Sequence, residues 1–487
     1  MRPKIRFLSD QLIQQIIAEA KQLLCTLGVE MQNRHALDLL ADAGAQVDFK
    51  KWQIRFTDKL IDDAVKSTPS SFKLFDTLGV ETHQFEGDKV YFTPGSAALH
   101  ILDHQSGQIR KPLTADYIQY VKVVSQLNYI ASQSTALIPS DVHENISDSY
   151  RLFLSLLYGR KPVVTGAFTI EAFRIMKELQ LAVRGTESAL REKPLTIFSC
   201  CPTSPLKWSE VTSQNVMDCA QYSIPIELIA MPLSGFIAPV SLVGSLIQHT
   251  AETLSGIVLS QLSRPGTPLL YGGSPAIFDV RYETTPMGAI ETMMIDCAYN
   301  EIGKYMGIPT QAYISLSDAK NLDAQAGMES GMGATLAVLA GINSISGPGM
   351  IDFESCQSLE KLVLDNELSG MCYRLVKGIE PRQDFPAQPI FEELLQEQHL
   401  LISEHTRRYL REEHFFPGPV IDRANRARWR EEGGQTLGDR AHAQVQKFLK
   451  SYRLPELSPD IMKSLVQLME QEASRVGQDR LPERPEN

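Results

Sequence analysis

Apolar residues follow a regular alternation between residues 114 and 377. Short apolar runs of strand length alternate with longer segments in which apolar residues recur every three or four positions. This pattern predicts parallel strands separated by helices. The expected strands cover 129–136, 162–166, 194–199, 225–230, 267–271, 309–314 and 342–346, and the expected helices cover 114–127, 145–158, 169–184, 209–222, 240–262, 287–306, 320–340 and 357–377.

Seven strand–helix units are thus visible, and the apolar run 98–102 supplies the expected eighth strand. Eight parallel strands close into a barrel, so the fold class is predicted to be α/β, a (β/α)8 TIM barrel. A doubly wound open sheet is the alternative. Its glycine-rich phosphate loop has no counterpart, because Gly327-x-x-x-Gly331-x-Gly333 lies inside a helical pattern.

The two ends of the chain follow other patterns. Residues 10–27 form an amphipathic helix before Gly28, and a period of two over 72–103 predicts a small sheet. After Gly378, prolines mark a linker that precedes further helices. We therefore expect an N-terminal helical and small β extension (1–90), the barrel (91–380) and a C-terminal helical appendage (381–487).

Composition excludes several function classes. Of the 487 residues, 43% are hydrophobic, and the formal charge of −11 argues against nucleic acid or a membrane surface as partner. No apolar run has transmembrane length and the N-terminus lacks a signal-peptide pattern, so a cytoplasmic protein is predicted. The seven cysteines form no CxxC pair and the histidines no HExxH motif, so no metal site is expected.

Polar residues gather after two consecutive expected strands, where an α/β barrel keeps its chemistry. Arginine binds carboxylates through two hydrogen bonds, and the second loop also fits the start of a capped, solvated helix. The first loop carries Ser274, Asp279 and Arg281, and the second carries Asp318, Lys320, Gln325 and Glu329.

Aromatic residues lie near several strand ends. A quaternary ammonium group has no N–H to donate, so proteins hold it against aromatic faces, although any single aromatic residue is more often part of the core. The candidates for substrate binding are Phe92, Phe236, Tyr271, Phe278 and Tyr313, together with His100.

Several motifs together resemble the trimethylamine methyltransferase family. They are Tyr91-Phe92-Thr93-Pro94-Gly95, Gly273-Ser274-Pro275, Asp279-x-Arg281, the run from Ser317-Asp318-Ala319-Lys320 to Glu329, Leu364-Asp365-Asn366-Glu367 and His405-Thr406-Arg407-x-Tyr409. The resemblance implies a TIM-barrel enzyme that moves a methyl group from a methylated amine to the cobalt of a corrinoid. A separate small corrinoid-binding protein carries that cofactor, which is not permanently bound to this chain.

Trimethylamine enzymes of the family contain pyrrolysine, whereas this chain has only standard residues. It is therefore similar to the branch that demethylates quaternary amines such as glycine betaine. On this basis the aromatic candidates would hold the ammonium group, and Arg281 with His100 would contact a substrate carboxylate. The catalytic candidates Asp318, Lys320, Gln325 and Glu329 would shape the rim where the corrinoid docks. A homo-oligomer is expected.

Two other functions fit parts of the pattern. Lys320, placed just after a strand, could form a Schiff base in a lyase or aldolase. A non-catalytic quaternary-amine binding protein would need the aromatic residues but no methyl acceptor.

Overall fold

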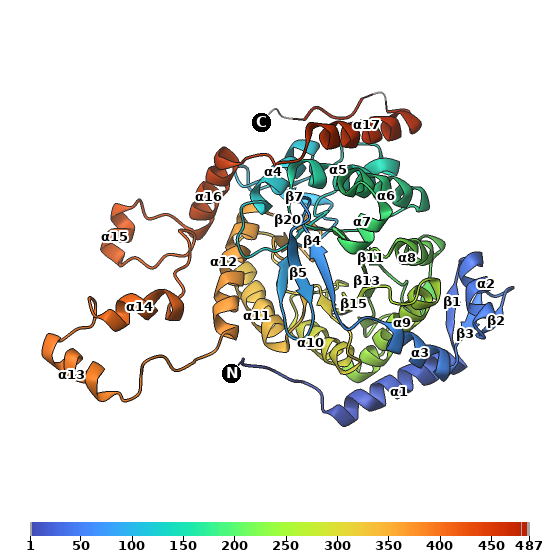
Figure 1. The fold of residues 1–487 in the computed structure, drawn as a ribbon, viewed down its shortest axis with the longest axis horizontal. Helices are drawn as coiled ribbons and strands as arrows, with labels where there is room; N and C mark the ends of the chain where they lie inside the picture. Colours follow the sequence, from blue (N-terminus) through green and yellow to red (C-terminus); the bar gives the residue numbers. More distant parts are fainter. Residues whose placement is uncertain (1, 479, 485–487) are drawn as a thin grey trace.

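The computed structural model describes residues 2–478 and 480–484, and central strands surrounded by helices make up its main body (Figure 1). A five-stranded parallel sheet has the order β15-β13-β11-β10-β9, and a three-stranded parallel sheet has the order β17-β18-β6. The strands are β6 (Tyr91–Thr93), β9 (Gln133–Ser134), β10 (Val163–Thr165), β11 (Thr196–Cys200), β13 (Ile226–Ala230), β15 (Leu269–Gly273), β17 (Gln311–Ala312) and β18 (Ser344–Ser346).

Two further parallel bridges connect the sheets. One joins Phe92 of β6 to Ile130, just before β9, and the other joins Tyr271 of β15 to Thr310, just before β17. Parallel pairing therefore continues through eight strands and returns to β6. The predicted α/β class is confirmed.

The assignment of the eighth strand to 98–102 was wrong. The strand between β18 and β9 is β6, which lies earlier in the chain. Residues 100–102 instead form β7 in a separate four-stranded sheet, where β7 pairs with β20 and β8. The segments 91–93 and 98–102 are both short and apolar, so only their pairing partners show which of them belongs among the eight strands. This sheet contains β7 (His100–Leu102), β8 (Ile109–Arg110), β19 (Met350–Ile351) and β20 (Cys356–Gln357).

The helices predicted between the strands are present, and serine or threonine caps begin several of them. Ser241, for example, accepts a hydrogen bond from the backbone N–H of Gly244 at the start of α9. The helices of the main body are α4 (Thr114–Val124), α5 (Ser147–Tyr158), α6 (Ile170–Arg184), α7 (Glu187–Glu192), α8 (Glu210–Tyr222), α9 (Leu242–Ser263), α10 (Ile290–Tyr305), α11 (Ala324–Ala340) and α12 (Leu359–Val376), with a 3-10 turn at Glu144–Ile146.

A hairpin of β4 (Phe72–Phe75) and β5 (Glu81–Phe85) lies at the amino-terminal ends of the strands. Phe75 donates its N–H to the carbonyl of Pro194, which precedes β11. Leu74 and Phe85 form a hydrophobic cluster with Val164, Ile197 and Leu270. The hairpin thus supplies apolar side chains to the inward faces of the strands at this end.

The N-terminal segment packs on the outside of the main body, where α1 contacts α9 and α10. The predicted amphipathic helix is confirmed as α1, and Gly28 follows it with a φ of +75°. The elements are α1 (Asp10–Thr26), α2 (Arg34–Asp42), α3 (Asp58–Ser67) and a sheet of β1 (Val29–Met31), β2 (Gln46–Asp48), β3 (Gln53–Arg55) and β12 (Lys207–Trp208).

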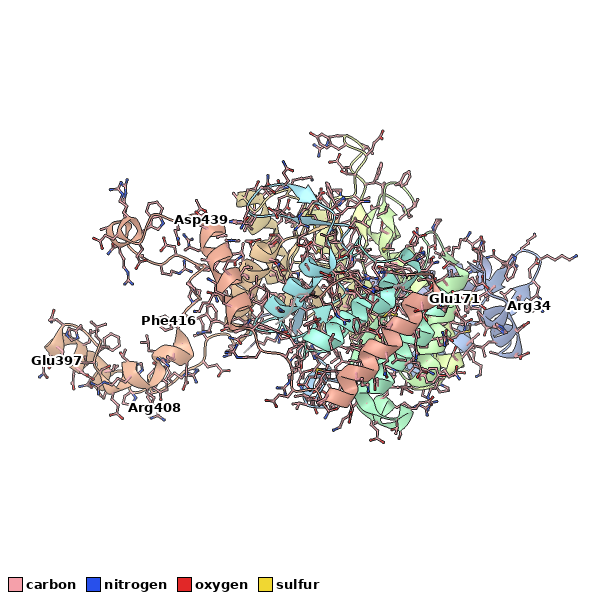
Figure 2. The ribbon with its side chains drawn as sticks, turned by 90° about the horizontal axis from the view of Figure 1, so that it is seen from above. Arg34, Glu171, Glu397, Arg408, Phe416 and Asp439 are labelled. Atoms are coloured by element: carbon pink, nitrogen blue, oxygen red, sulfur yellow. The ribbon has the colours of Figure 1, made fainter. Side chains whose placement is uncertain are left out.

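The C-terminal helices fall into two groups. Helix α16 (Leu437–Ser451) contacts α12 and α4, and α17 (Pro459–Arg475) contacts α5 and α6. The arm of α13 (Gln388–Glu397), α14 (Glu404–Glu413) and α15 (Arg426–Glu431) extends away from the main body, as Glu397 and Arg408 show in Figure 2. Across residues 2–478 and 480–484, every helix falls short of the length and apolar content that crossing a bilayer requires.

Candidate functional site

A buried carboxyl group lies on the inward face of the strands. Glu227 of β13 is fully buried and stands in register with Ser199 of β11, whose hydroxyl donates to Oε1 of Glu227 at 2.6 Å. The other oxygen, Oε2, has no hydrogen-bond partner among the described residues. Burial raises the pKa of Glu227 to about 7, although the Ser199 hydrogen bond lowers it. This carboxyl group therefore titrates near neutral pH.

A second carboxyl group, Glu354, enters the same region from the turn between β19 and β20. Its Oε1 accepts the backbone N–H of Ser96 at 3.3 Å. Burial raises the pKa of Glu354 to about 8, the Ser96 N–H opposes this, and the charge of Glu227 adds to the rise. The Glu227 charge thus disfavours ionisation of Glu354.

Tyr313, directly after β17, completes the cluster. Its hydroxyl shares a hydrogen bond of 2.9 Å with the Ser96 hydroxyl, and only 6% of the residue is exposed. Burial holds the pKa of Tyr313 well above its usual value, and the charges of Glu227 and Glu354 add to the effect. Burial also raises the pKa of Cys201, with contributions from its neighbour Cys200 and the same two glutamates. We call Ser96, Ser199, Cys201, Glu227, Tyr313 and Glu354 the carboxylate cluster.

Several polar side-chain atoms on the inward faces of β17 and β18 have no hydrogen-bond partner among the described residues. Ile345 packs in the main core, so its neighbours Ser344 and Ser346 take the opposite, inward face of β18. Their hydroxyl oxygens and Nε2 of Gln311 are buried and lack partners within the described part of the chain. Buried polar atoms nearly always bind a partner, so water or a ligand must satisfy them.

Strained backbone lies on both sides of the hydrogen bond between Ser96 and Glu354. Ala97 has a φ of +61°, and Asp352, Phe353 and Glu354 have φ values of +52°, +56° and +67°. Such left-handed conformations are unfavourable for residues with a side chain and gather at functional sites. Here they direct the Glu354 carboxyl group toward Ser96.

Glycine is required at one strand position beside these groups. A Cβ at Gly272 would lie 2.5 Å from Oε1 of Gln311. That oxygen accepts the backbone N–H of Gly273 at 3.2 Å, so the Gln311 amide is held across β15. A larger residue at 272 would displace it.

Two predicted aromatic residues meet at the carboxyl ends of the strands. Phe236 and Phe278 stack with ring centroids 4.7 Å apart and an interplanar angle of 20°. They follow β14 (Leu233–Ser234) and β16 (Ala276–Ile277), and 64% of Phe236 is exposed. Nearby, half-buried Ser274 donates its N–H to the carbonyl of Ala230. An aromatic surface is therefore open to solvent at this end.

Arg281 is also exposed at this end, where it forms an ion pair with Asp279. Its Nε and Nη2 donate to the two carboxylate oxygens at 3.0 and 2.6 Å, and 76% of the arginine side chain is accessible. The guanidinium group is thus held in a defined orientation and still presents donors to solvent.

Asp318 and Glu329 connect two loops to helix α11. Asp318 accepts the N–H groups of Met287 and Gly288 at 3.0 and 2.9 Å, and Glu329 accepts the Ser317 hydroxyl at 2.6 Å and the Asp318 N–H at 2.9 Å. Burial raises the pKa of Asp318 to about 6, and the Glu329 charge contributes. These contacts fit the structural alternative, in which the polar residues brace the loops.

Gln325 and Lys320 contact Glu329 and Asp318, respectively. Gln325 donates to Glu329 at 2.9 Å. Lys320 donates to the Asp318 carbonyl at 2.6 Å, lies 3.5 Å from the Asp352 carboxylate and sits 3.8 Å from the ring centroid of Phe353. Its side chain is 52% exposed, so Lys320 is at the surface.

Two predicted substrate-binding residues face helices, and a third lies in β7. Tyr271 faces α9, where its hydroxyl donates to Thr250 at 3.0 Å. Phe92 packs edge-on against Tyr373 of α12, with centroids 5.6 Å apart. His100 lies in β7, and its buried Nδ1 has no partner among the residues described.

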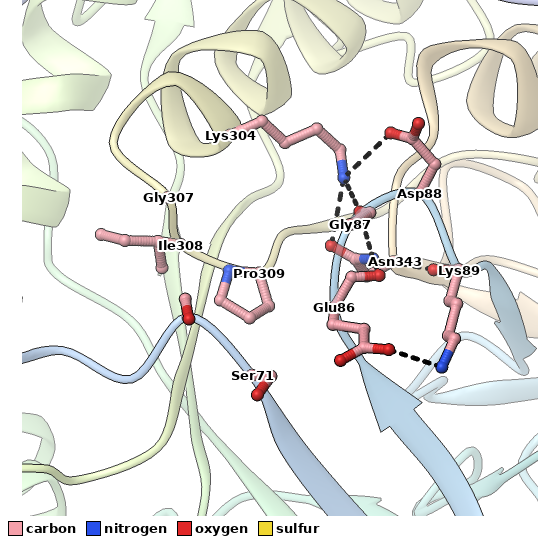
Figure 3. A pocket seen from close by; sticks show the side chains of 11 residues that line it. Ser71, Glu86, Gly87, Asp88, Lys89, Lys304, Gly307, Ile308, Pro309 and Asn343 are labelled. Carbon is pink, nitrogen blue, oxygen red and sulfur yellow. Dashed lines mark hydrogen bonds and ion pairs between the residues drawn. The ribbon is translucent and has the colours of Figure 1, made fainter.

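A cavity of about 600 Å³ lies near the amino-terminal ends of β17 and β18 (Figure 3). Its charged groups pair with one another: Lys89 binds Glu86 at 2.6 Å, and Lys304 lies 3.7 Å from the Asp88 carboxylate. None of the residues that line this cavity belongs to the carboxylate cluster, so the two sites are separate.

Sequence reasoning missed Glu227 and Glu354. Glu227 had one available signal, because it is a charged residue inside an expected apolar strand, 225–230. Glu354 lies in a loop between an expected strand and helix and had none. Tyr313 was the one predicted residue that the structure places in the carboxylate cluster.

Comparison with known proteins gives the chain a family. The family description "Trimethylamine methyltransferase (MTTB)" matches residues 1–477. The glycine betaine methyltransferase of Desulfitobacterium hafniense strain Y51 is 28% identical over 479 residues, which cover 98% of this chain and 99% of that protein. Trimethylamine methyltransferase MttB of D. hafniense strain DSM 10664 / DCB-2 is 27% identical over 467 residues, covering 95% and 94%.

Among solved structures, the monomethylamine methyltransferase of Methanosarcina barkeri is similar in fold, with a TM-score of 0.53. Its sequence is 11% identical, and the match covers 97% of this chain and 89% of that one. The match of residues 1–477 to the family description agrees with the motifs around Asp279, Arg281 and Asp318. The chain belongs to the trimethylamine methyltransferase family.

Proposed function

We propose that the eight strands close as a (β/α)8 barrel and that the chain transfers a methyl group from a quaternary amine to a Co(I) corrinoid. The donor would resemble glycine betaine, and a small partner protein would carry the corrinoid. The observation that supports this most directly is the carboxylate cluster, where Glu227 and Glu354 offer up to two negative charges beside unpaired polar atoms.

A pair of carboxyl groups, Glu227 buried and Glu354 partly exposed, suits a cationic ligand. Without a ligand, Glu227 is about half protonated and Glu354 is mostly protonated at pH 7, because burial raises the pKa of Glu227 to about 7 and that of Glu354 to about 8. A quaternary ammonium ion would favour ionisation, and the resulting attraction is strong in a region of low dielectric constant. The Tyr313 ring adds an aromatic surface beside this charge.

The reaction itself needs no proton. The methyl group leaves nitrogen as a methyl cation equivalent, the C–N electron pair stays on the departing tertiary amine, and Co(I) supplies both electrons of the new bond. The protein's contribution is to position the methyl group and exclude water. Glu227 would hold the nitrogen, while Ser199 orients the carboxylate through its hydrogen bond.

The exposed residues at the carboxyl ends would serve the substrate and the partner. In this proposal Phe236 and Phe278 guide the ammonium ion inward, and Arg281 contacts a substrate carboxylate. The corrinoid protein docks over the surface that carries Asp318, Lys320, Gln325 and Glu329. The same proposal includes a cytoplasmic homo-oligomer. It also divides each chain into an N-terminal extension (1–90), the barrel (91–380) and a C-terminal appendage (381–487).

The contacts of Lys320 favour methyl transfer over a Schiff-base lyase. Its ammonium group is exposed and faces Asp352 and the Asp318 carbonyl, whereas Schiff-base lysines are desolvated. A non-catalytic binding protein would use the same carboxylate cluster. Only turnover distinguishes it from the enzyme.

The test mixes the purified chain with Co(I) cobalamin or reduced corrinoid proteins and a panel of quaternary, tertiary and secondary amines. We expect the visible spectrum to change to that of methyl-Co(III) with a quaternary amine. Methylation from trimethylamine alone would reject the substrate class. Binding of a quaternary amine without methylation of any acceptor would support the binding protein instead.

A further inference from the structure

Three side chains from distant parts of the sequence meet where α16 packs on the main body. His104 follows β7, Glu360 lies in the first turn of α12, and His442 lies in α16. One potential ligand atom from each lies within 4.8 Å of the other two. A cavity of about 250 Å³ borders all three.

The detailed contacts leave the three groups close together. Nδ1 of His442 lies 2.8 Å from Oε1 of Glu360, and the His104 and His442 rings are stacked at 4.2 Å with an interplanar angle of 11°. Glu360 is 5% exposed, whereas both histidines are partly exposed. The carboxylate is thus fixed, and the rings have room to turn.

The neighbouring positive charge is already neutralised. Arg110, which lines the same cavity, binds Asp116 at 2.7 Å and lies 3.7 Å from Asp103. Its guanidinium group therefore does not compete for the Glu360 carboxylate. The local balance of charge leaves Glu360 available to a cation.

We propose that His104, Glu360 and His442 bind a divalent transition metal ion of the zinc class. Two imidazole nitrogens and one carboxylate oxygen form a donor set that zinc accepts at about 2.0–2.2 Å, with tetrahedral geometry. Such bonds place ligand atoms roughly 3.3 Å apart, so the three ligand atoms, now within 4.8 Å of one another, must move closer when the metal binds. Because a metal–nitrogen bond lies in the imidazole plane, the His104 ring must rotate out of the stack.

The cavity supplies the fourth position, where a water molecule completes the coordination. The metal would link the turn after β7, α12 and α16, and so fasten α16 to the main body. Ligand binding to the folded state alone raises the free energy of unfolding in proportion to the logarithm of metal concentration. This site does not depend on the proposed methyl transfer.

The experiment uses the full-length chain freed of metal with a chelator. Zn2+ titration followed by calorimetry should give one ion per chain, and Co2+ should give the visible absorption of a tetrahedral N/O site. Zn2+ should also raise the Tm. His104→Asn should weaken Zn2+ binding about tenfold or more and abolish the cobalt spectrum.

His399→Asn is the matched control, because His399 is exposed in the arm and remote from the cluster. His104→Asn is chosen since no hydrogen bond of His104 ties the described elements together, so folding is preserved. Equal Zn2+ affinity in the wild type, His104→Asn and His399→Asn would overturn the proposal. So would an unchanged Tm together with the absence of a cobalt spectrum.

Discussion

Ser199 and Glu227 stand side by side on adjacent parallel strands, and the serine hydroxyl donates to one glutamate oxygen at 2.6 Å. The other oxygen has no partner among the described residues. A carboxyl group that is fixed through one oxygen and open at the other is pre-organised to bind a cation. This relationship underlies the first three predictions.

Replacing Glu227 with Gln should lower kcat/KM for a quaternary amine by about 10- to 100-fold, because a charged contact contributes about 1.5–3 kcal/mol. The change preserves the shape of the side chain and removes its charge. Steady-state methylation of Co(I) cobalamin measures it. Glu291→Gln, an exposed residue of α10, is the control and should keep wild-type activity. Full activity in Glu227→Gln would exclude a role for this charge.

Quaternary amine binding should strengthen as the pH rises through about 7 and 8, the pKa values of Glu227 and Glu354 in the free protein. The cation binds the ionised carboxylates, so binding releases protons below these pKa values. Calorimetry in two buffers with different ionisation enthalpies measures the release. In Glu227→Gln the pH dependence should become shallower. Proton uptake on binding would contradict the proposal.

Protein stability without ligand should show the opposite trend. The pKa of Glu227 rises from 4.5 to about 7 on folding, so the folded protein binds more protons than the unfolded chain between these values. Its contribution is complete below about pH 4.5 and is lost as the pH rises to about 7, an effect of roughly 3 kcal/mol. Urea unfolding of wild type and Glu227→Gln across this range measures the difference. Identical pH slopes would show that Glu227 titrates normally.

Asp318→Ala should mainly reduce stability. The substitution leaves the N–H groups of Met287 and Gly288 without their acceptor, which costs about 1–3 kcal/mol of unfolding free energy. Thermal and urea unfolding measure the loss. Asp323→Ala is a useful comparison, because it removes only the helix cap at Ala326 and should cost about 1 kcal/mol. A stable Asp318→Ala variant with no activity would instead identify a direct catalytic role.

Arg281→Ala should raise KM for glycine betaine about two- to fivefold, because an exposed charge pair contributes up to about 1 kcal/mol. KM for tetramethylammonium, which has no carboxylate, should stay within about twofold. Parallel kinetics on the two substrates decide the point. An equal rise for both would remove Arg281 from carboxylate recognition.

The sequence by itself determined the α/β class, the order of most strands and helices, and the family. Alternating strand and helix patterns report burial along the chain, so they predict a strand over 225–230 and a helix over 240–262 without knowledge of neighbours, and the structure places β13 and α9 there. The Ser-Asp-Ala-Lys run from Ser317 and the Asp279-x-Arg281 motif likewise indicated the family from the sequence alone.

Only the tertiary structure decided which residues share a space. It replaced 98–102 with β6 among the eight strands, because pairing partners are not encoded in a short apolar run. It turned Tyr271 and Phe92 toward helices, brought Glu354 within electrostatic reach of Glu227, and placed His104 beside His442. The side chain's direction alternates along a strand, and contacts between distant segments form only when the chain folds.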